Sequence, residues 1–253
     1  MAMNDAEIKD AVRKSWDASS ATYDTLPGHK IGTDAEKEAW KRELIRDLPQ
    51  SKFAVLDVGC GTGAMGLLFA EMGHRVTGVD LSEGMMAKAK KKAEAQKLSL
   101  DLKKGDAEHL PFETGTFDVV VNRHLLWTLP HPDAALREWH RVLKAGGHLL
   151  VIDGVWNDRS VSMRAKRLVS DGLTRVFDPT CHAHYSQELR SQLPHDGGIP
   201  KETMMSFLNG AEFAVVSIRD LMYIRDMQRS QQPWYRRFAP QKTYYILTAR
   251  KEA

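Results

Sequence analysis

Residues 55–63 read VLDVGCGTG, an apolar run that passes directly into a glycine-rich turn. The apolar run predicts a short buried strand, and the apolar spacing at residues 65–69 predicts a helix that begins just after the turn. A strand, a glycine turn and a helix in this order build a nucleotide-sized crevice at the carboxyl edge of a sheet. Gly59, Gly61 and Gly63 suit such a crevice, because a ligand that touches the backbone leaves no room for a Cβ.

A second strand with an acid at its end follows at residues 76–80, which read VTGVD. Asp80 stands 19 residues after Gly61, near the spacing at which a carboxylate binds the hydroxyls of a ribose. A nicotinamide dinucleotide site would give a similar signal, since the glycines loosely fit its fingerprint. Asp57 argues against that site, because its charge beside the turn disfavours a pyrophosphate and tolerates a cationic ligand.

Two further stretches complete the pattern. Residues 105–112, GDAEHLPF, place an acid in a turn after a third strand, and residues 117–153 begin with the apolar strand FDVVVN and end with HLLVID. The four stretches resemble the class I S-adenosylmethionine-dependent methyltransferases, in particular the small-molecule branch related to ubiquinone/menaquinone C-methyltransferases. The resemblance is strong over residues 53–153 and looser elsewhere, and it implies S-adenosyl-L-methionine as the cofactor.

The resemblance implies an α/β fold with a Rossmann-like, mostly parallel seven-stranded sheet of order 3-2-1-4-5-7-6, whose last strand is antiparallel, and with helices on both faces. Alternating strand and helix patterns agree with a covered parallel sheet. They predict strands near residues 53–58, 75–80, 98–104, 117–122, 147–153, 213–221 and 243–250. Helices are expected at residues 83–97 and 201–209, and from Pro132 to the pair Gly146 and Gly147.

The domain organisation follows from where this alternation begins and breaks. Residues 1–50 carry two helical patterns without a strand, and we expect them to form an N-terminal helical cap on a methyltransferase domain at residues 51–253. Residues 154–199 interrupt the alternation directly after the fifth strand. We therefore expect this segment to be an inserted helical lid at the carboxyl edge, above the acceptor.

The resemblance also implies roles for residues that match its motifs. It assigns the methionine part of the cofactor to the backbone at Gly59, Gly61 and Gly63, and the ammonium group of the cofactor to Asp57. Contact between Asp57 and a helix N-terminus is the structural alternative. Asp80 is expected to bind the ribose hydroxyls, and an acid at the end of a buried strand in any case needs a polar partner.

The remaining cofactor residues are implied in the same way. Leu81 is expected to pack on the adenine, Asp106 to accept a hydrogen bond from its exocyclic amine, and Ala107 to supply a backbone donor. Asn122 and Arg123 end the fourth strand and are expected under the methionine and sulfonium end. For these last two residues a purely structural role is equally open.

Methyl transfer from a sulfonium is an in-line displacement, so the cofactor carries the difficult part of the chemistry. A general base is needed only where the acceptor is protonated at the working pH. The candidate catalytic residues are His124, His184 and Tyr23, the histidines because imidazole titrates near neutrality. Tyr23 and His29 belong to a segment that resembles the part of many small-molecule members folded over the pocket.

The acceptor itself stays open. Trp127 and Thr128 stand where many relatives carry an acid and a histidine near the substrate, so neither the acceptor nor the methylated atom, oxygen, nitrogen, carbon or sulfur, can be transferred from them. The basic segment 222–242, with Trp234 and Tyr235, makes an RNA methyltransferase an alternative. A non-catalytic protein that binds S-adenosylmethionine is a second alternative. A net charge of +3 and the lack of a separate RNA-binding domain favour a small-molecule acceptor.

Composition sets further bounds on the 253-residue chain. Cys60 and Cys181 cannot form a disulfide framework, which fits a reducing cytoplasm, and His182 and His184 beside Cys181 lack the further ligands that a metal site needs. No apolar run approaches the roughly 18 residues of a membrane span. The polar N-terminus does not resemble a signal peptide. We expect no metal and no membrane partner, and monomer and homodimer remain alternatives.

Overall fold

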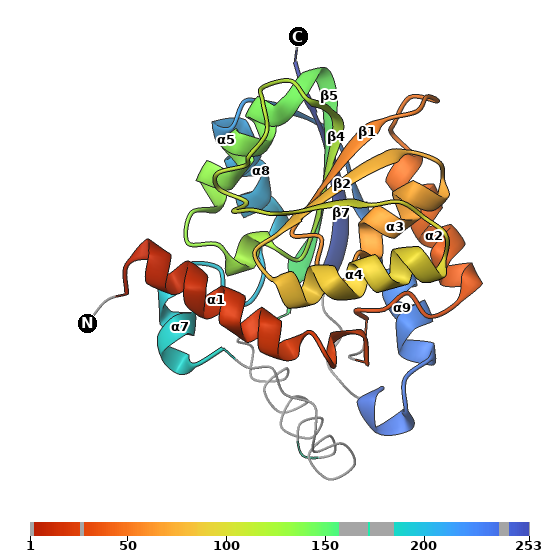
Figure 1. Cartoon of the computed structure of the whole chain (residues 1–253), viewed down its shortest axis with the longest axis vertical. Helices are drawn as coiled ribbons and strands as arrows, with labels where there is room; N and C mark the ends of the chain where they lie inside the picture. The colour runs from red at the N-terminus through yellow and green to blue at the C-terminus, as the bar shows by residue number, and fades with distance from the viewer. Residues whose placement is uncertain (1–2, 26–27, 157–171, 173–184, 238–242, 253) are drawn as a thin grey trace.

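The computed structural model describes residues 3–25, 28–156, 172, 185–237 and 243–252. Seven strands form one sheet of order β3-β2-β1-β4-β5-β7-β6 (Figure 1). The strands are β1 Ala54–Val58, β2 Arg75–Asp80, β3 Asp101–Lys104, β4 Phe117–Arg123, β5 Leu143–Val155, β6 Phe213–Asp220 and β7 Thr243–Lys251. Neighbours from β3 to β5 are parallel, and β7 runs antiparallel to both β5 and β6. The expected strand order and the antiparallel last strand are therefore confirmed.

Strand β1 lies inside the sheet, between β2 and β4, and is buried along its whole length. Its alternate side chains enter two separate cores: Leu56 joins the core that contains Trp139, and Val55 joins the core that contains Trp40. Period-two alternation sends successive side chains to opposite faces of a strand. A strand without a polar face is thus the consequence of helices covering both sides of the sheet.

Two layers of helices cover the sheet, with α5 and α8 on one face and α2 and α3 on the other (Figure 1). The helices that the structure describes are α1 Asp5–Ser19, α2 Asp34–Ile45, α3 Ala64–Glu71, α4 Glu83–Ala95, α5 Pro132–Val142, α7 Gln187–Gln192, α8 Lys201–Gly210 and α9 Met222–Ser230. Among the described residues, no helix combines the length and the apolar character that crossing a bilayer requires.

Two expected boundaries are wrong. Helix α5 begins at Pro132 as expected but ends at Val142, and Gly146 and Gly147 lie inside β5 instead of ending the helix. Gly146 has φ +74°, and the pairing of β4 with β5 changes register nearby, so these glycines serve an irregular strand start. Strand β3 begins at Asp101, three residues later than the predicted range, because it is an exposed edge strand with little apolar pattern.

Helix α1 lies beside α4 and α7 near the carboxyl ends of the strands (Figure 1). Asp17 at its end accepts hydrogen bonds from the Ser82 hydroxyl at 2.6 Å and from the Gly84 amide at 3.1 Å. Lys9 near its start contacts the carboxylates of Asp106 at 2.7 Å and Glu108 at 2.6 Å. These contacts fix α1 at both ends over the edge where ligands of α/β sheets bind.

The expected lid at residues 154–199 lies mostly outside the described residues. Its described last part contains α7, whose Leu189 and Leu193 pack with Ile8 and Val12 of α1. The end of the segment therefore belongs to the same side of the molecule as the N-terminal helix.

Candidate functional site

A cavity of about 440 Å³ opens at the carboxyl edge, where β1, β2 and β4 end side by side. Its lining comes from the turns after these strands, from α1, from Tyr23, Gly28 and His29, from Trp156 and from α9. The volume lies within the roughly 300–1,000 Å³ that is usual for small-molecule sites. Strands from separate parts of the sequence thus assemble one ligand-sized space.

The glycine turn after β1 forms one wall of the cavity. Gly59 and Gly61 line it, with φ values of +67° and +53°. The amides of Gly59 and Cys60 donate to the Val79 carbonyl at 2.8 and 3.1 Å, which ties the turn to β2. A Cβ placed on Gly61 would meet only the Gly59 carbonyl, at 3.9 Å, so the space beside this residue is open to a ligand.

Asp80 and Leu81 also line the cavity, at the end of β2. The Asp80 carboxylate accepts hydrogen bonds from the amides of Gly61 and Ser82, each at 2.8 Å. Burial raises the pKa of Asp80 above its ordinary value, and the two amide bonds oppose that rise. Each carboxylate oxygen keeps a further lone pair, so the group can still accept from the hydroxyls of a ligand.

Four of the expected cofactor residues do not line the cavity, namely Asp106, described below, and Asp57, Gly63 and Asn122. Asp57 is buried and accepts a hydrogen bond from the Gly66 amide in α3 at 2.8 Å, the contact that sequence reasoning had given as its structural alternative. Burial raises the pKa of Asp57 to about 7. Gly63 caps the N-terminus of α3, and Asn122 donates to the Val58 carbonyl at 3.0 Å. These residues hold the turn and the strand ends from behind.

Ala107 lines the cavity beside the third strand, whereas the carboxylate of Asp106 turns to α1. Asp106 accepts from the Lys9 ammonium at 2.7 Å and from the Glu108 amide at 2.9 Å. Burial opposes ionisation, but these hydrogen bonds prevail and hold the pKa of Asp106 below its ordinary value. Lys9 itself lines the cavity, so it stands between the acid and the ligand space.

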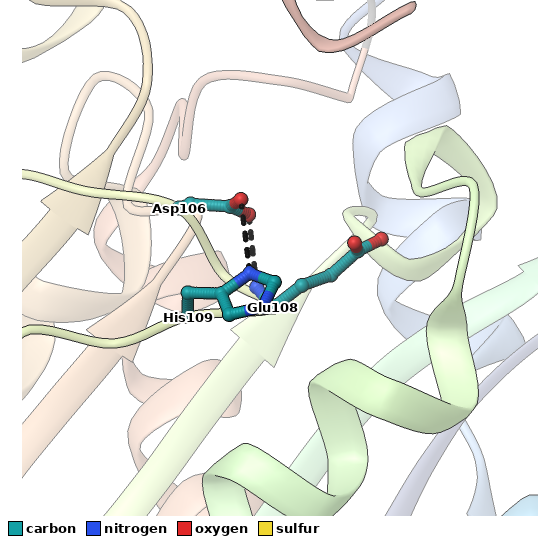
Figure 2. Close-up of side chains that lie close together, drawn as sticks. All are labelled: Asp106, Glu108 and His109. Atoms are coloured by element: carbon teal, nitrogen blue, oxygen red, sulfur yellow. Dashed lines mark hydrogen bonds and ion pairs between the residues drawn. The ribbon is translucent and has the colours of Figure 1, made fainter. Parts of the chain in front are cut away.

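Asp106, Glu108 and His109 lie close together (Figure 2), and their ligand atoms are within 4.8 Å of one another. Such a group resembles a metal site in composition. The Lys9 ammonium already contacts both carboxylates, and Glu108 also accepts from the His131 amide at 2.9 Å. We therefore assign this group to the attachment of α1 and not to a metal ion.

Tyr23 and His29 also line the cavity, as the sequence predicted for this segment. Their rings stack at 4.3 Å with an angle of 8° between the planes. Burial raises the pKa of Tyr23 to about 12, so its phenol is a hydrogen-bond donor and not a base near neutral pH. His124 also lines the cavity and stacks on Tyr244 at 5.2 Å, while His184 lies outside the described residues.

Aromatic rings form a further part of the cavity lining. Trp16, Trp127 and Trp156 line the cavity, and Trp127 meets Trp156 at 5.5 Å and Trp16 at 6.5 Å, both edge to face. The Trp127 Nε1 is buried, and none of the described residues accepts a hydrogen bond from it. The wall therefore offers flat apolar surface together with one donor.

Helix α9 supplies the polar end of the cavity. Arg225, Gln228, Arg229 and Gln232 all line it from this helix and the turn after it. The sequence identified the basic segment 222–242, but it did not predict that side chains of this segment would line the cavity. The signal was present, because positions three and four residues apart share one face of a helix.

Arg123, expected at the cofactor, lies against this polar end. It lines the cavity, donates from Nε to the Tyr244 hydroxyl at 3.0 Å, and also donates to the Gly28 carbonyl. Its guanidinium stands 5.2 Å from the Trp40 ring centroid. Arg123 thus links β4, β7 and the loop at residues 23–32 beside the expected acceptor space.

Residues 56–151 match the family model described as a methyltransferase domain. The ubiquinone/menaquinone biosynthesis C-methyltransferase UbiE of Rhizobium johnstonii is 39% identical over 123 residues, which are 46% of this chain and 48% of that protein. The demethylmenaquinone methyltransferase of Staphylococcus aureus is 34% identical over 158 residues, or 60% of this chain and 64% of its own. This chain therefore spans less than two thirds of the length of these curated relatives.

Solved structures show the same fold at low sequence identity. The crystal structure of the cyclase SpnF covers 100% of this chain and 98% of its own, with a TM-score of 0.63 and 22% identity. Phosphoethanolamine N-methyltransferase 2 of Haemonchus contortus, solved with phosphomonomethylethanolamine and S-adenosylhomocysteine, covers 97% of this chain and 60% of its own, with a TM-score of 0.67 and 19% identity. Residues 56–151 are thus similar to a methyltransferase domain, part of the chain is similar to the ubiquinone/menaquinone C-methyltransferases, and the chain as a whole shares the fold of these solved structures.

Proposed function

We propose that this protein is an S-adenosylmethionine-dependent methyltransferase that transfers a methyl group to a small-molecule acceptor by in-line displacement. The observation that carries the proposal is one cavity whose lining has two chemically different parts. Gly61 and Asp80 belong to one part, and an aromatic wall with Tyr23 and His124 belongs to the other. A nucleoside cofactor and a separate acceptor can therefore meet inside a single space.

The cofactor fits the part of the cavity beside Gly61 and Asp80. Gly61 leaves open the space that a Cβ would fill, and Asp80 presents a buried carboxylate held by two backbone amides. In our assignment Asp80 takes the ribose hydroxyls, Leu81 packs on the adenine, and Ala107 offers its backbone. The Asp106 carboxylate accepts a hydrogen bond from the adenine amine only if it can bind that amine and the Lys9 ammonium at the same time. Asp57, Gly63 and Asn122 act as positioning residues, since their contacts shape the turn.

When bound, the cofactor supplies a methyl group that its sulfonium has already activated. The work of the protein is to align the acceptor and to exclude water, and such positioning can contribute on the order of 7–11 kcal/mol. Trp127 and Trp156 provide the apolar wall, and the free Nε1 donor of Trp127 orients a polar atom of the acceptor. The flat walls suit an acceptor with an aromatic ring.

Proton transfer is assigned to the side chains that face the acceptor space. His124 accepts a proton if the acceptor carries one, because it lines the cavity and imidazole titrates near neutral pH. Tyr23 stays protonated near neutral pH and donates a hydrogen bond. His184 remains a candidate from the sequence alone. We infer a cytoplasmic location from the same cysteine content that predicted a reducing compartment.

The test uses variants of Asp80 and a matched acid elsewhere on the sheet. Asp80→Ala removes hydrogen bonds to a charged group, so its affinity for S-adenosylhomocysteine should fall by roughly 1.5–3 kcal/mol. Asp101→Ala, an exposed acid at the start of β3, should bind like the unaltered protein. Titration calorimetry measures both, and thermal unfolding checks that the variants fold. Unchanged affinity in a folded Asp80→Ala protein would place the ribose elsewhere.

Methyl transfer itself is followed as release of S-adenosylhomocysteine from S-adenosylmethionine with a panel of phenolic and hydroquinone acceptors. Turnover should require an acceptor and should fall with Asp80→Ala at limiting cofactor. Release that is independent of every acceptor, with cofactor binding intact, would favour the non-catalytic alternative.

A further inference from the structure

We propose that the acceptor carries an oxyanion, a carboxylate or a phosphate, which binds at the α9 end of the cavity to Arg225 with support from Arg123 and Arg229. The proposal rests on the function proposed above and adds the chemical class of the acceptor. The aromatic wall suits a ring and the arginines suit an anion, so the acceptor we propose is a ring with an anionic substituent.

The first observation is a charge imbalance inside the cavity. Arg123, Arg225 and Arg229 all line it, and none of them forms an ion pair with a described residue. Asp80 stands at the cofactor end, and the other lining acid, Asp226, is exposed on α9. Burying guanidinium groups without a counter-charge is costly, so the site lacks a negative charge that a ligand can supply.

The carboxylate whose field reaches both Arg123 and Arg225 is that of Glu36, and it already accepts other hydrogen bonds. Its oxygens accept from Gln228 Nε2 at 2.7 Å, from the Gly32 amide at 2.9 Å and from Trp40 Nε1 at 3.4 Å. The buried Asp57 carboxylate also acts on Arg123, but burial raises its pKa to about 7 and it accepts its hydrogen bond from the Gly66 amide. Among the described residues neither carboxylate forms an ion pair with Arg123 or Arg225, so both guanidinium groups can still bind an anion.

The second observation is the orientation of Arg225. Its guanidinium carbon lies 4.3 Å from the Tyr244 ring centroid, and one terminal nitrogen donates to Gln228 Oε1 at 3.3 Å. The Nε atom is buried, and no described residue accepts from it. Burial lowers the pKa of Arg225 below its ordinary value, which agrees with a charge that lacks compensation. A guanidinium held flat with a free N–H edge matches the geometry of an oxyanion.

The neighbouring cations have different roles. Arg123 makes its hydrogen bonds to neutral acceptors, the Tyr244 hydroxyl and the Gly28 carbonyl, so it contributes field while it positions Tyr244. Arg229 lies one helical turn after Arg225, lines the cavity, and adds a more exposed positive charge at its mouth. Together, Arg123, Arg225 and Arg229 make a site that favours anions over neutral ligands.

The carboxylate of the cofactor is a second anion that could bind to Arg225. The experiment distinguishes it from an anion on the acceptor, because the cofactor site is filled first. The probes are benzoate, phenyl phosphate and neutral benzyl alcohol, each titrated into protein saturated with S-adenosylhomocysteine. Binding is read from tryptophan fluorescence, since Trp127 and Trp156 line the same cavity. We expect benzoate or phenyl phosphate to bind at least about tenfold more tightly than benzyl alcohol, and the stronger of the two identifies the oxyanion.

Three variants complete the design. Arg225→Gln should lose the tenfold preference, Arg225→Lys should keep part of it, and Arg137→Gln, an exposed arginine on α5, should keep all of it. The affinity for S-adenosylhomocysteine should stay unchanged in all three. No preference for the anion in the unaltered protein would overturn the proposal, and so would a loss of cofactor affinity in Arg225→Gln with the preference intact. Failure of S-adenosylhomocysteine to bind at all would instead refute the proposed function.

Discussion

Gly61 is the residue at which backbone conformation and ligand space can be tested separately. Its φ of +53° makes alanine strained, at a cost of roughly 1–2 kcal/mol in the free energy of unfolding. The Cβ itself would meet no atom closer than 3.9 Å. We expect Gly61→Ala to fold and to bind S-adenosylhomocysteine at least about tenfold more weakly, because the methyl group enters the space assigned to the cofactor.

Gly115 provides the control for this substitution. It has φ +69°, and a Cβ there would have nothing within 4 Å, so Gly115→Ala imposes similar strain outside the cavity. Calorimetry and thermal unfolding of both variants separate the effects. Equal cofactor affinity in the two alanine variants would contradict the assignment of the glycine turn.

Asp153 makes a second residue-scale prediction, on pH dependence. This buried acid accepts from the Gly154 amide at 2.7 Å, while its other oxygen has no partner among the described residues. Burial raises the pKa of Asp153 to about 8 from an ordinary value of 3.8. Between these values the folded state binds a proton that the unfolded state has lost, so stability falls as pH rises.

Asp153→Asn removes that proton linkage and keeps the shape of the side chain. Relative to the unaltered protein, the variant should gain stability between about pH 5 and about pH 8, by at least about 1.4 kcal/mol, the equivalent of one pKa unit. Chemical unfolding at each pH measures the difference. The stability of the Asp153→Asn variant should still decline with rising pH, but less steeply, because Asp57 keeps its pKa raised to about 7. Parallel stability curves for the two proteins would show that Asp153 is ionised in the folded state.

At the scale of elements, the attachment of α1 over the cavity is the feature to test. Lys9 joins α1 to Asp106 and Glu108, and its removal leaves two carboxylates without their cation. Lys9→Gln should therefore speed amide hydrogen exchange in α1 while exchange in the sheet stays slow. Bound S-adenosylhomocysteine should slow exchange in α1 and at Gly28 and His29, which line the cavity.

Lys14→Gln is the matched control, because Lys14 lies on the same helix and, among the described residues, pairs with Asp10 at the surface. It changes the charge equally and should leave exchange in α1 unchanged. If Lys9→Gln exchanged no faster than Lys14→Gln, the attachment of α1 would depend on Asp17 and apolar packing instead.

Elements also show what could be predicted from the sequence. The central strands were predictable because Val55 and Leu56 enter separate cores and a strand buried on both faces must be continuously apolar. The place of Asp80 followed from its position at a strand end. The inward orientation of Arg225 did not, because the rotation of α9 depends on the buried hydrogen bond from its Gln228 to Glu36 of α2. Asp57 contacts the Gly66 amide of α3 and does not line the cavity. This could not be predicted, because no local motif specifies which face of β1 meets α3.

At the scale of the whole molecule, the sheet order decides which residues share the cavity. Strand β4 lies beside β1 although helices and strands separate them in sequence, so Arg123 and Gly59 line the same space. The antiparallel β7 brings Tyr244 under both Arg123 and Arg225. The motifs predicted that the glycine turn and Asp80 lie together, whereas the place of the α9 arginines in the same cavity depends on long-range packing that only the folded chain reveals.

The most direct test of the central claim is titration calorimetry of the purified protein with S-adenosylhomocysteine, with NAD as the competing ligand. The glycine turn and Asp80 predict one site with a dissociation constant in the micromolar range, or about −8 kcal/mol. NAD should bind far more weakly, because the buried Asp57 stands behind the turn where a pyrophosphate would lie. No detectable binding of S-adenosylhomocysteine at about millimolar concentration, or tighter binding of NAD, would contradict the claim.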